Sequence, residues 1–331
     1  MARIASILIG FTPFHLLPML ELAGEAQGEL HLFHPDLRAD VLQALGPKVS
    51  YLGGCDAPRG PRVLRYRRAG REIDRILREY DDVALYAPHP FNPLANYALF
   101  HPQAGRRYIY QDGILNYYDA RSPLASWKWR LRQKAKAALA GMPYTVYQGH
   151  LSGVDALPVA GGYFTHPDMI ARAARFPLVK RLRLAAAAAP DRPAEGGVLF
   201  LDQPIEQVVG NDKAAFLRAR TFAYVERLGG KVIYKPHYTQ KAVTPPPRWR
   251  MLDEALAALP AEEVVAKLGV NQVVSYFTSA LANIVVAYPD IACHATAADA
   301  VPITIDGRPS TLAELFEGFG VRVVRFDAKP D

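Results

Sequence analysis

The sequence has few cysteines and no long hydrophobic run, and each shortage excludes a class of protein. Its 331 residues include only two cysteines, Cys55 and Cys293, which lie far apart in the chain. Two distant cysteines support neither a disulfide framework nor a zinc site, so we expect a cytoplasmic protein. No segment reaches the roughly 18 uninterrupted apolar residues that a membrane-spanning helix needs. The first apolar run, residues 4–9, is short and ends at Gly10-Phe-Thr-Pro13, which favours a buried strand over a signal peptide.

Several common ligand-binding motifs are also missing from the sequence. It contains neither Gly-x-x-x-x-Gly-Lys-Ser/Thr nor Gly-x-Gly-x-x-Gly, which disfavours a P-loop ATPase and a dinucleotide oxidoreductase. It also lacks an Asp-x-Asp metal motif. The net charge of +7 favours an anionic partner, but composition does not choose between nucleotides, acidic glycans, membranes and nucleic acid.

Short apolar runs alternate with amphipathic segments of helical length through most of the chain. This alternation predicts βαβ units and largely parallel sheets, which is the α/β class. The expected strands are residues 4–9, 30–33, 49–52, 83–86, 107–110, 144–147, 198–201, 231–234 and 272–275. The expected helices are residues 16–23, 39–45, 69–79, 93–100, 124–140, 212–228, 261–268 and 280–287.

A stretch rich in proline and glycine interrupts this alternation near the middle of the chain. It runs from Pro190-Asp-Arg-Pro193 to Gly196-Gly197, after which a new strand begins. The chain length fits two domains of roughly 150 residues each. We therefore predict a domain of residues 1–190 and a domain of residues 191–331, each doubly wound and facing a central cleft. Ligands of such sheets bind beyond the carboxyl ends of the strands.

Three expected strands end in an abrupt polar turn. The first turn carries Asp112-Gly113, where a carboxylate can act as a general base, although an ordinary Asp-Gly turn has the same pattern. The second is Lys235-Pro236-His237-Tyr238, which places a cation and an imidazole at a strand end. The third carries Thr278 and Ser279, which can cap the following helix or leave its amides to bind phosphate.

Taken in order, these segments resemble the motifs of bacterial sialyltransferases and polysialyltransferases. That family has an acidic-acidic-Gly motif, a His-Pro motif and a Ser/Thr motif; the counterparts here are Gln111-Asp112-Gly113, Lys235-Pro236-His237 and Thr278-Ser279. Two shorter segments are similar to lipooligosaccharide sialyltransferases, namely Thr12-Pro13-Phe14-His15 and Leu259-Pro260-Ala-Glu262. The matching segments span nearly the whole chain, and each is short.

The resemblance implies a GT-B fold and an inverting transfer of sialic acid, or a related nonulosonic acid, from a CMP donor to a glycan. Asp112 would be the base in an acceptor-binding first domain, and His237 would assist the departing CMP phosphate in the second. Donor-binding roles would fall to Thr12, His15, Lys235, Glu262, Thr278 and Ser279, with Glu262 at the ribose or cytosine. Candidate acceptor contacts are Asn92, Asn96 and Asn116. For His15, Asn92 and Asn96, purely structural roles are equally consistent. No metal or other cofactor is expected, because a CMP donor carries one phosphate.

The chain departs from the family pattern at two positions. Gln111 replaces the first acidic residue, which often supplies the base, so either Asp112 has that role or another carboxylate such as Asp202 does. Tyr238 replaces the proline that often follows the histidine. The alternatives that stay open are a transferase using CMP-Kdo or another nucleotide sugar, and an inactive, transferase-like nucleotide-binding protein.

Basic residues concentrate in two segments of the first half. Residues 62–78 are rich in arginine, and residues 127–136 combine two tryptophans with several cations. Such a helix suits an anionic membrane surface, which would place the protein at the periphery of the inner membrane. The alternative is a solvated helix whose tryptophans pack inward. Nucleic-acid binding would instead require a continuous basic face across both domains, and we expect no nucleic-acid partner.

Overall fold

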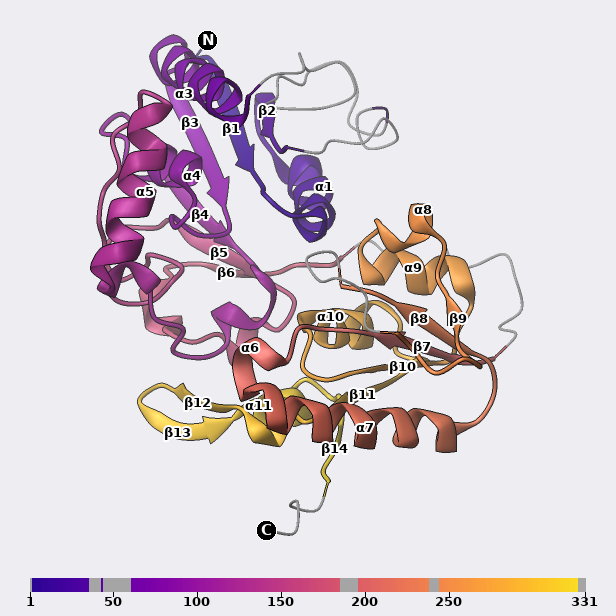
Figure 1. The fold of residues 1–331 in the computed structure, drawn as a ribbon. Coiled ribbons are helices and arrows are strands. Elements are labelled where there is room, and N and C mark those ends of the chain that lie inside the picture. Colours follow the sequence, from indigo (N-terminus) through magenta and orange to yellow (C-terminus); the bar gives the residue numbers. More distant parts are fainter. Residues whose placement is uncertain (1, 36–42, 44–60, 185–195, 238–243, 327–331) are drawn as a thin grey trace. The chain divides into compact units, whose positions relative to one another are not determined.

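The computed structural model describes residues 2–35, 43, 61–184, 196–237 and 244–326 (Figure 1). The chain divides into two compact units, Met1–Arg183 and Leu184–Asp331. The sequence places the domain boundary between residues 190 and 191, which lies outside the described residues. The strand expected at 49–52 lies outside them too, as does the helix expected at 39–45 apart from Gln43.

The first unit is built on a six-stranded parallel sheet in the order β2-β1-β3-β4-β5-β6. Its strands are β1 (Ile4–Ile9), β2 (Glu29–Phe33), β3 (Asp82–Ala87), β4 (Arg106–Tyr110), β5 (Gly161–Phe164) and β6 (Val179–Arg181). Strands β1 and β3 are buried along nearly their whole length, because helices and loops cover a parallel sheet on both faces. Since β1 pairs with both β2 and β3, the winding direction of the sheet reverses between β1 and β3.

Helices connect these strands, as the alternation in the sequence predicts (Figure 1). The α-helices are α1 (Leu16–Glu25), α3 (Arg62–Glu79), α4 (Pro93–Leu99) and α5 (Trp127–Leu139). The short 3-10 helices are η1 (Pro13–His15), η2 (Gly113–Asn116), η3 (Pro123–Ala125), η4 (Pro167–Met169) and η5 (Ala173–Arg175). Helix α4 packs against both α3 and α5, so these three helices form one layer.

The second unit has its own six-stranded parallel sheet, in the order β14-β11-β10-β7-β8-β9. Its strands are β7 (Val198–Leu201), β8 (Val232–Lys235), β9 (Arg250–Met251), β10 (Gln272–Ser275), β11 (Ala292–Thr296) and β14 (Arg322–Val324), and β12 (Pro302–Ile305) and β13 (Arg308–Thr311) form a separate hairpin. The helices are α6 (Glu206–Val209), α7 (Asn211–Leu228), α8 (Glu254–Ala257), α9 (Ala261–Leu268), α10 (Ser279–Ala287), η6 (Ala298–Ala300) and α11 (Leu312–Gly318). The winding reverses between β7 and β10.

These two units confirm the predicted α/β class with two Rossmann-like sheets. One expected strand, residues 144–147, is irregular in the structure. The amide side chain of Asn96 replaces the missing strand partner there, because it donates to the Thr145 carbonyl at 2.9 Å and accepts from the Thr145 N–H at 2.8 Å. The fifth strand is instead β5, whose Gly161 lies so close to the next strand that a Cβ would stand 2.7 Å from the Leu178 carbonyl oxygen.

Candidate active site

A pocket of about 350 Å³ lies in the first unit, beyond the carboxyl ends of β1, β3 and β4. This is the reversal point of the sheet, where doubly wound domains bind their ligands. The loops after these strands contribute Phe11, Thr12, His15, His89, Phe91, Asn92, Pro93 and Asp112. Helices α3 and α5, with the residue after α5, contribute Val63, Tyr66, Gln133, Lys136, Leu139 and Ala140.

The carboxylate of Asp112 lies between two imidazoles. His15 Nε2 stands 3.0 Å from Oδ1 of Asp112, and His89 Nε2 stands 3.1 Å from Oδ2. His15 is almost fully buried, whereas the Asp112 side chain is 21% exposed. The loops after three different strands therefore meet at one acidic group.

The hydrogen bonds also fix which nitrogen of each imidazole carries the proton. His15 Nδ1 accepts the backbone N–H groups of Phe11 and Thr12 at 3.0 and 3.3 Å, and His89 Nδ1 accepts that of Phe91 at 3.1 Å. A backbone N–H only donates, so Nδ1 of each ring is unprotonated and Nε2–H donates to Asp112. This assignment rests on the bonding pattern. Both rings therefore orient the carboxylate.

Asp112 is held in its ionised form. Burial by itself raises the pKa of a carboxyl group, but the interactions with His89 and His15 outweigh it and hold the pKa of Asp112 well below its usual range. The Asp112 N–H donates to Asn116 Oδ1 at 2.7 Å, and Gly113 adopts a left-handed φ of 58° that closes the turn. The ionised carboxylate faces the pocket, where it can accept a hydrogen bond from a ligand hydroxyl.

Gln111 points away from this pocket. Its Oε1 atom accepts hydrogen bonds from the Tyr117 hydroxyl at 2.6 Å, the Thr165 N–H at 2.8 Å and the Thr165 hydroxyl at 2.7 Å. Successive side chains of an extended segment point to opposite sides, so Gln111 enters the core while Asp112 faces the pocket. The amide at position 111 is therefore a buried link between β4 and the residues that follow β5.

The other candidates of the first unit divide into pocket-lining and structural residues. Thr12 lines the pocket, and its carbonyl accepts from His34 Nε2 at 2.8 Å. Asn92 also lines it, while its side chain caps α4 and donates to the Tyr66 hydroxyl. Asn96 is fully buried and bonded to backbone groups, and Asn116 is 4% exposed and holds the Asp112 turn. We therefore assign Asn96 and Asn116 structural roles in place of acceptor contacts.

The sequence reasoning missed His89, although a signal for it exists. His89 stands between Pro88 and Pro90 directly after β3, where prolines stop the strand and leave the imidazole at its carboxyl end. The pocket walls supplied by α3 and α5 carry no comparable signal. Their contact with the loops depends on how the helices pack.

In the second unit, four candidates follow the carboxyl ends of three neighbouring strands. Lys235 ends β8 with His237 close behind it, Asp202 follows β7, and Thr278 comes after β10 and caps α10. Burial lowers the pKa of Lys235, whose Nζ donates to the Ala257 carbonyl at 2.5 Å. Burial and the neighbouring Lys235 lower the pKa of His237. Ser279 is the first residue of α10, and Tyr238 lies outside the described residues.

Two acidic candidates of this unit are enclosed by protein. Glu262 is 5% exposed and its Oε1 accepts from the Asn283 amide at 2.7 Å, while burial raises its pKa. Asp202 is 3% exposed, with one oxygen accepting from the Tyr234 hydroxyl at 2.5 Å and the other from the Gln203 N–H at 2.8 Å. Burial raises the pKa of Asp202 too. Within the second unit, both carboxyl groups are therefore largely shielded from solvent and hydrogen-bonded to protein groups.

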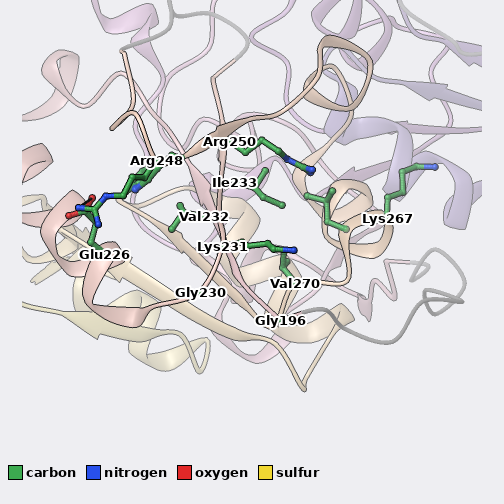
Figure 2. Close-up of a pocket in the computed structure, with 12 residues that line it drawn as sticks. Gly196, Glu226, Gly230, Lys231, Val232, Ile233, Arg248, Arg250, Lys267 and Val270 are labelled. Carbon is green, nitrogen blue, oxygen red and sulfur yellow. Dashed lines mark ion pairs between the residues drawn. The ribbon is translucent and has the colours of Figure 1, made fainter.

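A second hollow, of about 570 Å³, lies at the opposite, amino edge of the sheet in the second unit. Its rim carries Lys231, Arg248, Arg250 and Lys267 (Figure 2). Arg248 pairs with Glu226 at 3.5 Å. Figure 2 shows that Arg250 and Lys267 point elsewhere, so the cations do not converge on one point. This edge is remote from the strand ends that carry the candidates above.

No group of three or more His, Cys, Asp and Glu side chains within the described part of the chain is arranged to hold a metal ion. Among the described helices, none combines the length and the apolar character needed to cross a membrane.

No protein-family model matches this chain, and no curated protein matches it. Similar solved structures include the UDP-GlcNAc 2-epimerase of Methanocaldococcus jannaschii, with 10% identity over 98% of this chain and 89% of that one and a TM-score of 0.49. The glycosyltransferase SnogD of Streptomyces nogalater is 14% identical over 88% of this chain and 82% of its own, with a TM-score of 0.42. The spinosyn forosaminyltransferase SpnP is 12% identical over 85% of this chain and 78% of its own, with a TM-score of 0.39. These similarities are too low to support a conclusion about the reaction.

Proposed function

We propose that the chain is a glycosyltransferase that uses a nucleotide-sugar donor, with Asp112 accepting the proton of the acceptor hydroxyl. The observation that carries this proposal is the ionised Asp112 carboxylate, held by His15 and His89 in a pocket at the reversal point of the first sheet. Such a carboxylate can position a hydroxyl and receive its proton during attack.

The proposed reaction is a single displacement. The acceptor oxygen forms a bond to the anomeric carbon while the bond from that carbon to the phosphate oxygen breaks, and its electron pair leaves with the phosphate. The hydroxyl proton passes to Asp112. Because the pKa of Asp112 is low, this transfer comes late, once bond formation has made the hydroxyl acidic.

The second unit would hold the nucleotide phosphate in this proposal. Lys235 and His237 supply a cation and an imidazole at the end of β8, and the amides at the start of α10, next to Thr278 and Ser279, can bind an anion. Donors placed at the departing phosphate stabilise the charge that develops there. A single phosphate needs no metal ion in this scheme.

The motif order in the sequence favours CMP-activated sialic acid, or a related nonulosonic acid, as the donor and a glycan or glycolipid as the acceptor. CMP-Kdo and other nucleotide sugars remain the competing donors. The aromatic wall formed by Phe11 and Phe91 suits the apolar face of a sugar ring. An anionic membrane surface is the further partner that we propose, because the acceptor would then be presented on a lipid.

Nucleotide release tests this function directly. The purified chain is incubated separately with CMP-sialic acid, CMP-Kdo and UDP-sugars, and free CMP or UDP is measured with and without a glycan acceptor. We expect CMP release that His237→Ala and Asp112→Asn both reduce. Nucleotide binding without release, unchanged in both variants, would identify an inactive nucleotide-binding protein instead. Neither binding nor release with any donor would eliminate the proposal.

A further inference from the structure

The exposed apolar side chains of this protein are concentrated in one region. Nine large hydrophobic side chains are exposed among the described residues, and six of them lie on the first turn of α3 and on α5. These six are Val63, Leu64, Trp127, Trp129, Leu131 and Leu139. A soluble surface normally scatters such groups singly, so this concentration indicates a surface that contacts something.

Helix α5 arranges its outward side chains in a pattern that suits a lipid interface. Trp127, 66% exposed, and Leu131, 61% exposed, are four residues apart and therefore share one line along the helix. The helix contains five cations and no acidic residue. Lys128 and Arg132 follow the apolar pair by one position, so they flank it on one side. The tryptophans therefore do not both pack inward, which was the alternative interpretation of this helix.

We infer that the outward face of α5, defined by Trp127, Lys128, Leu131 and Arg132, docks on an anionic phospholipid bilayer. Exposed indole and leucine side chains leave water when they enter the headgroup region, which lowers the free energy. Flanking cations are attracted to acidic headgroups. Nucleic acid would use the cations but would leave Leu131 exposed to water. Because α5 has cations and no acidic residue, its charge is complementary to an anionic bilayer and not to a neutral one.

The same helix reaches the Asp112 pocket, so docking would place that pocket at the bilayer surface. Trp129 contacts Phe91, with ring centroids 5.7 Å apart, and both Phe91 and Leu139 line the pocket. Val63 of α3 lines it too. We therefore assign the apolar rim to the lipid portion of a lipid-linked acceptor whose sugar hydroxyl reaches Asp112. This second step rests on the proposed function, whereas the docking does not.

Vesicle binding tests the docking. The full chain is sedimented with phosphatidylcholine vesicles, and with vesicles containing about one-third phosphatidylserine, at about 0.1 M salt. We expect binding to the anionic vesicles only, and a fall of at least about tenfold in partitioning for the double variant Trp127→Ser, Leu131→Ser. The matched control is Val208→Ser, Met251→Ser, which removes two exposed apolar side chains from the second unit and should change partitioning by less than about twofold.

Fluorescence adds a readout that locates the contact. The chain has three tryptophans, and Trp249 is buried, so brominated lipids should quench Trp127 and Trp129 emission on binding. Full binding by the double variant, equal binding to neutral vesicles, or binding without quenching would overturn the inference. Nucleotide release from the donor, measured without vesicles, separates the two proposals: release without vesicle binding refutes the docking alone, and vesicle binding without release refutes the enzyme function alone.

Discussion

His15 Nε2 lies 3.0 Å from Asp112 Oδ1, across 97 residues of sequence. Because two backbone N–H groups hold the opposite nitrogen of His15, the buried ring cannot rotate without losing them. The loop after β1 therefore determines where the carboxylate at the end of β4 points. The contact between His15 and Asp112 therefore locates the candidate active site more narrowly than any single sequence motif does.

Replacing Asp112 with asparagine should abolish proton acceptance while keeping the size of the side chain. We expect kcat for sugar transfer to fall about a hundredfold to ten-thousandfold, the range for a lost general base. The control is Asp168→Asn, because the Asp168 side chain in the same unit is 88% exposed. A near-normal kcat in the Asp112 variant would show that the base lies elsewhere.

Removing His89 should change the pH dependence of transfer as well as its rate. His89 lowers the pKa of Asp112, so His89→Ala should raise that pKa and move the acidic limb of the kcat/KM profile to higher pH. His89→Gln keeps an N–H donor and should move the limb less. If both variants lose rate without moving the limb, His89 only supports the loop.

Glu21 should make stability depend on pH near neutrality. Burial raises the pKa of Glu21 to about 7. The Arg183 N–H donates a hydrogen bond to Glu21 Oε1 at 2.6 Å, which lowers the pKa and so opposes the effect of burial. The folded state therefore binds the proton more tightly than the unfolded chain, so stability falls as pH rises from about 4.5 to about 7. Glu21 is only half-buried, so solvent screening reduces the effect of the full shift; Glu21→Gln should remove this slope and add about 1–3 kcal/mol at pH 8. Urea titrations at several pH values measure it, and parallel curves for the two proteins would refute the expectation.

Asn96 should matter for stability and not for ligand binding. Its side chain is fully buried and bonds to the backbone at Pro90 and Thr145. Asn96→Ala leaves those backbone groups unpaired, so we expect a loss of about 2–4 kcal/mol in the free energy of unfolding. Asn211→Ala, at an exposed position, should change it by less than about 0.5 kcal/mol. Reduced acceptor affinity with unchanged stability would contradict this assignment.

The sequence predicts three strands to the residue. Residues 4–9, 198–201 and 272–275 match β1, β7 and β10, whose inner positions are mostly apolar and buried, as expected for parallel strands covered on both faces. β5 begins with two glycines instead, because a Cβ at Gly161 would collide with the Leu178 carbonyl and one at Gly162 with the rings of Phe164 and Phe176. Residues 144–147 have the composition of a strand, but the side-chain amide of Asn96 bonds to the backbone of Thr145 in place of a neighbouring strand. Single-sequence patterns do not reveal such a partner.

The same limits apply to the candidate site. Thr12, His15 and Asp112 are predictable because they follow apolar strands, and the carboxyl ends of parallel strands share one edge. Asn96, Asp202 and Glu262 have suitable side chains near suitable elements, but packing encloses them. Burial depends on contacts between segments that are distant in the sequence, and the type of a residue does not predict those contacts. Whether the candidate residues have the catalytic roles that the motifs imply stays a prediction.

The bonding of the two imidazoles has a consequence for the path of the transferred proton. Every ring nitrogen of His15 and His89 already has a fixed partner, so neither ring can pass a proton onward without breaking a backbone hydrogen bond. Neither imidazole therefore offers the proton a path away from Asp112. The exposed fifth of the Asp112 side chain gives a proton taken up there a direct route to solvent.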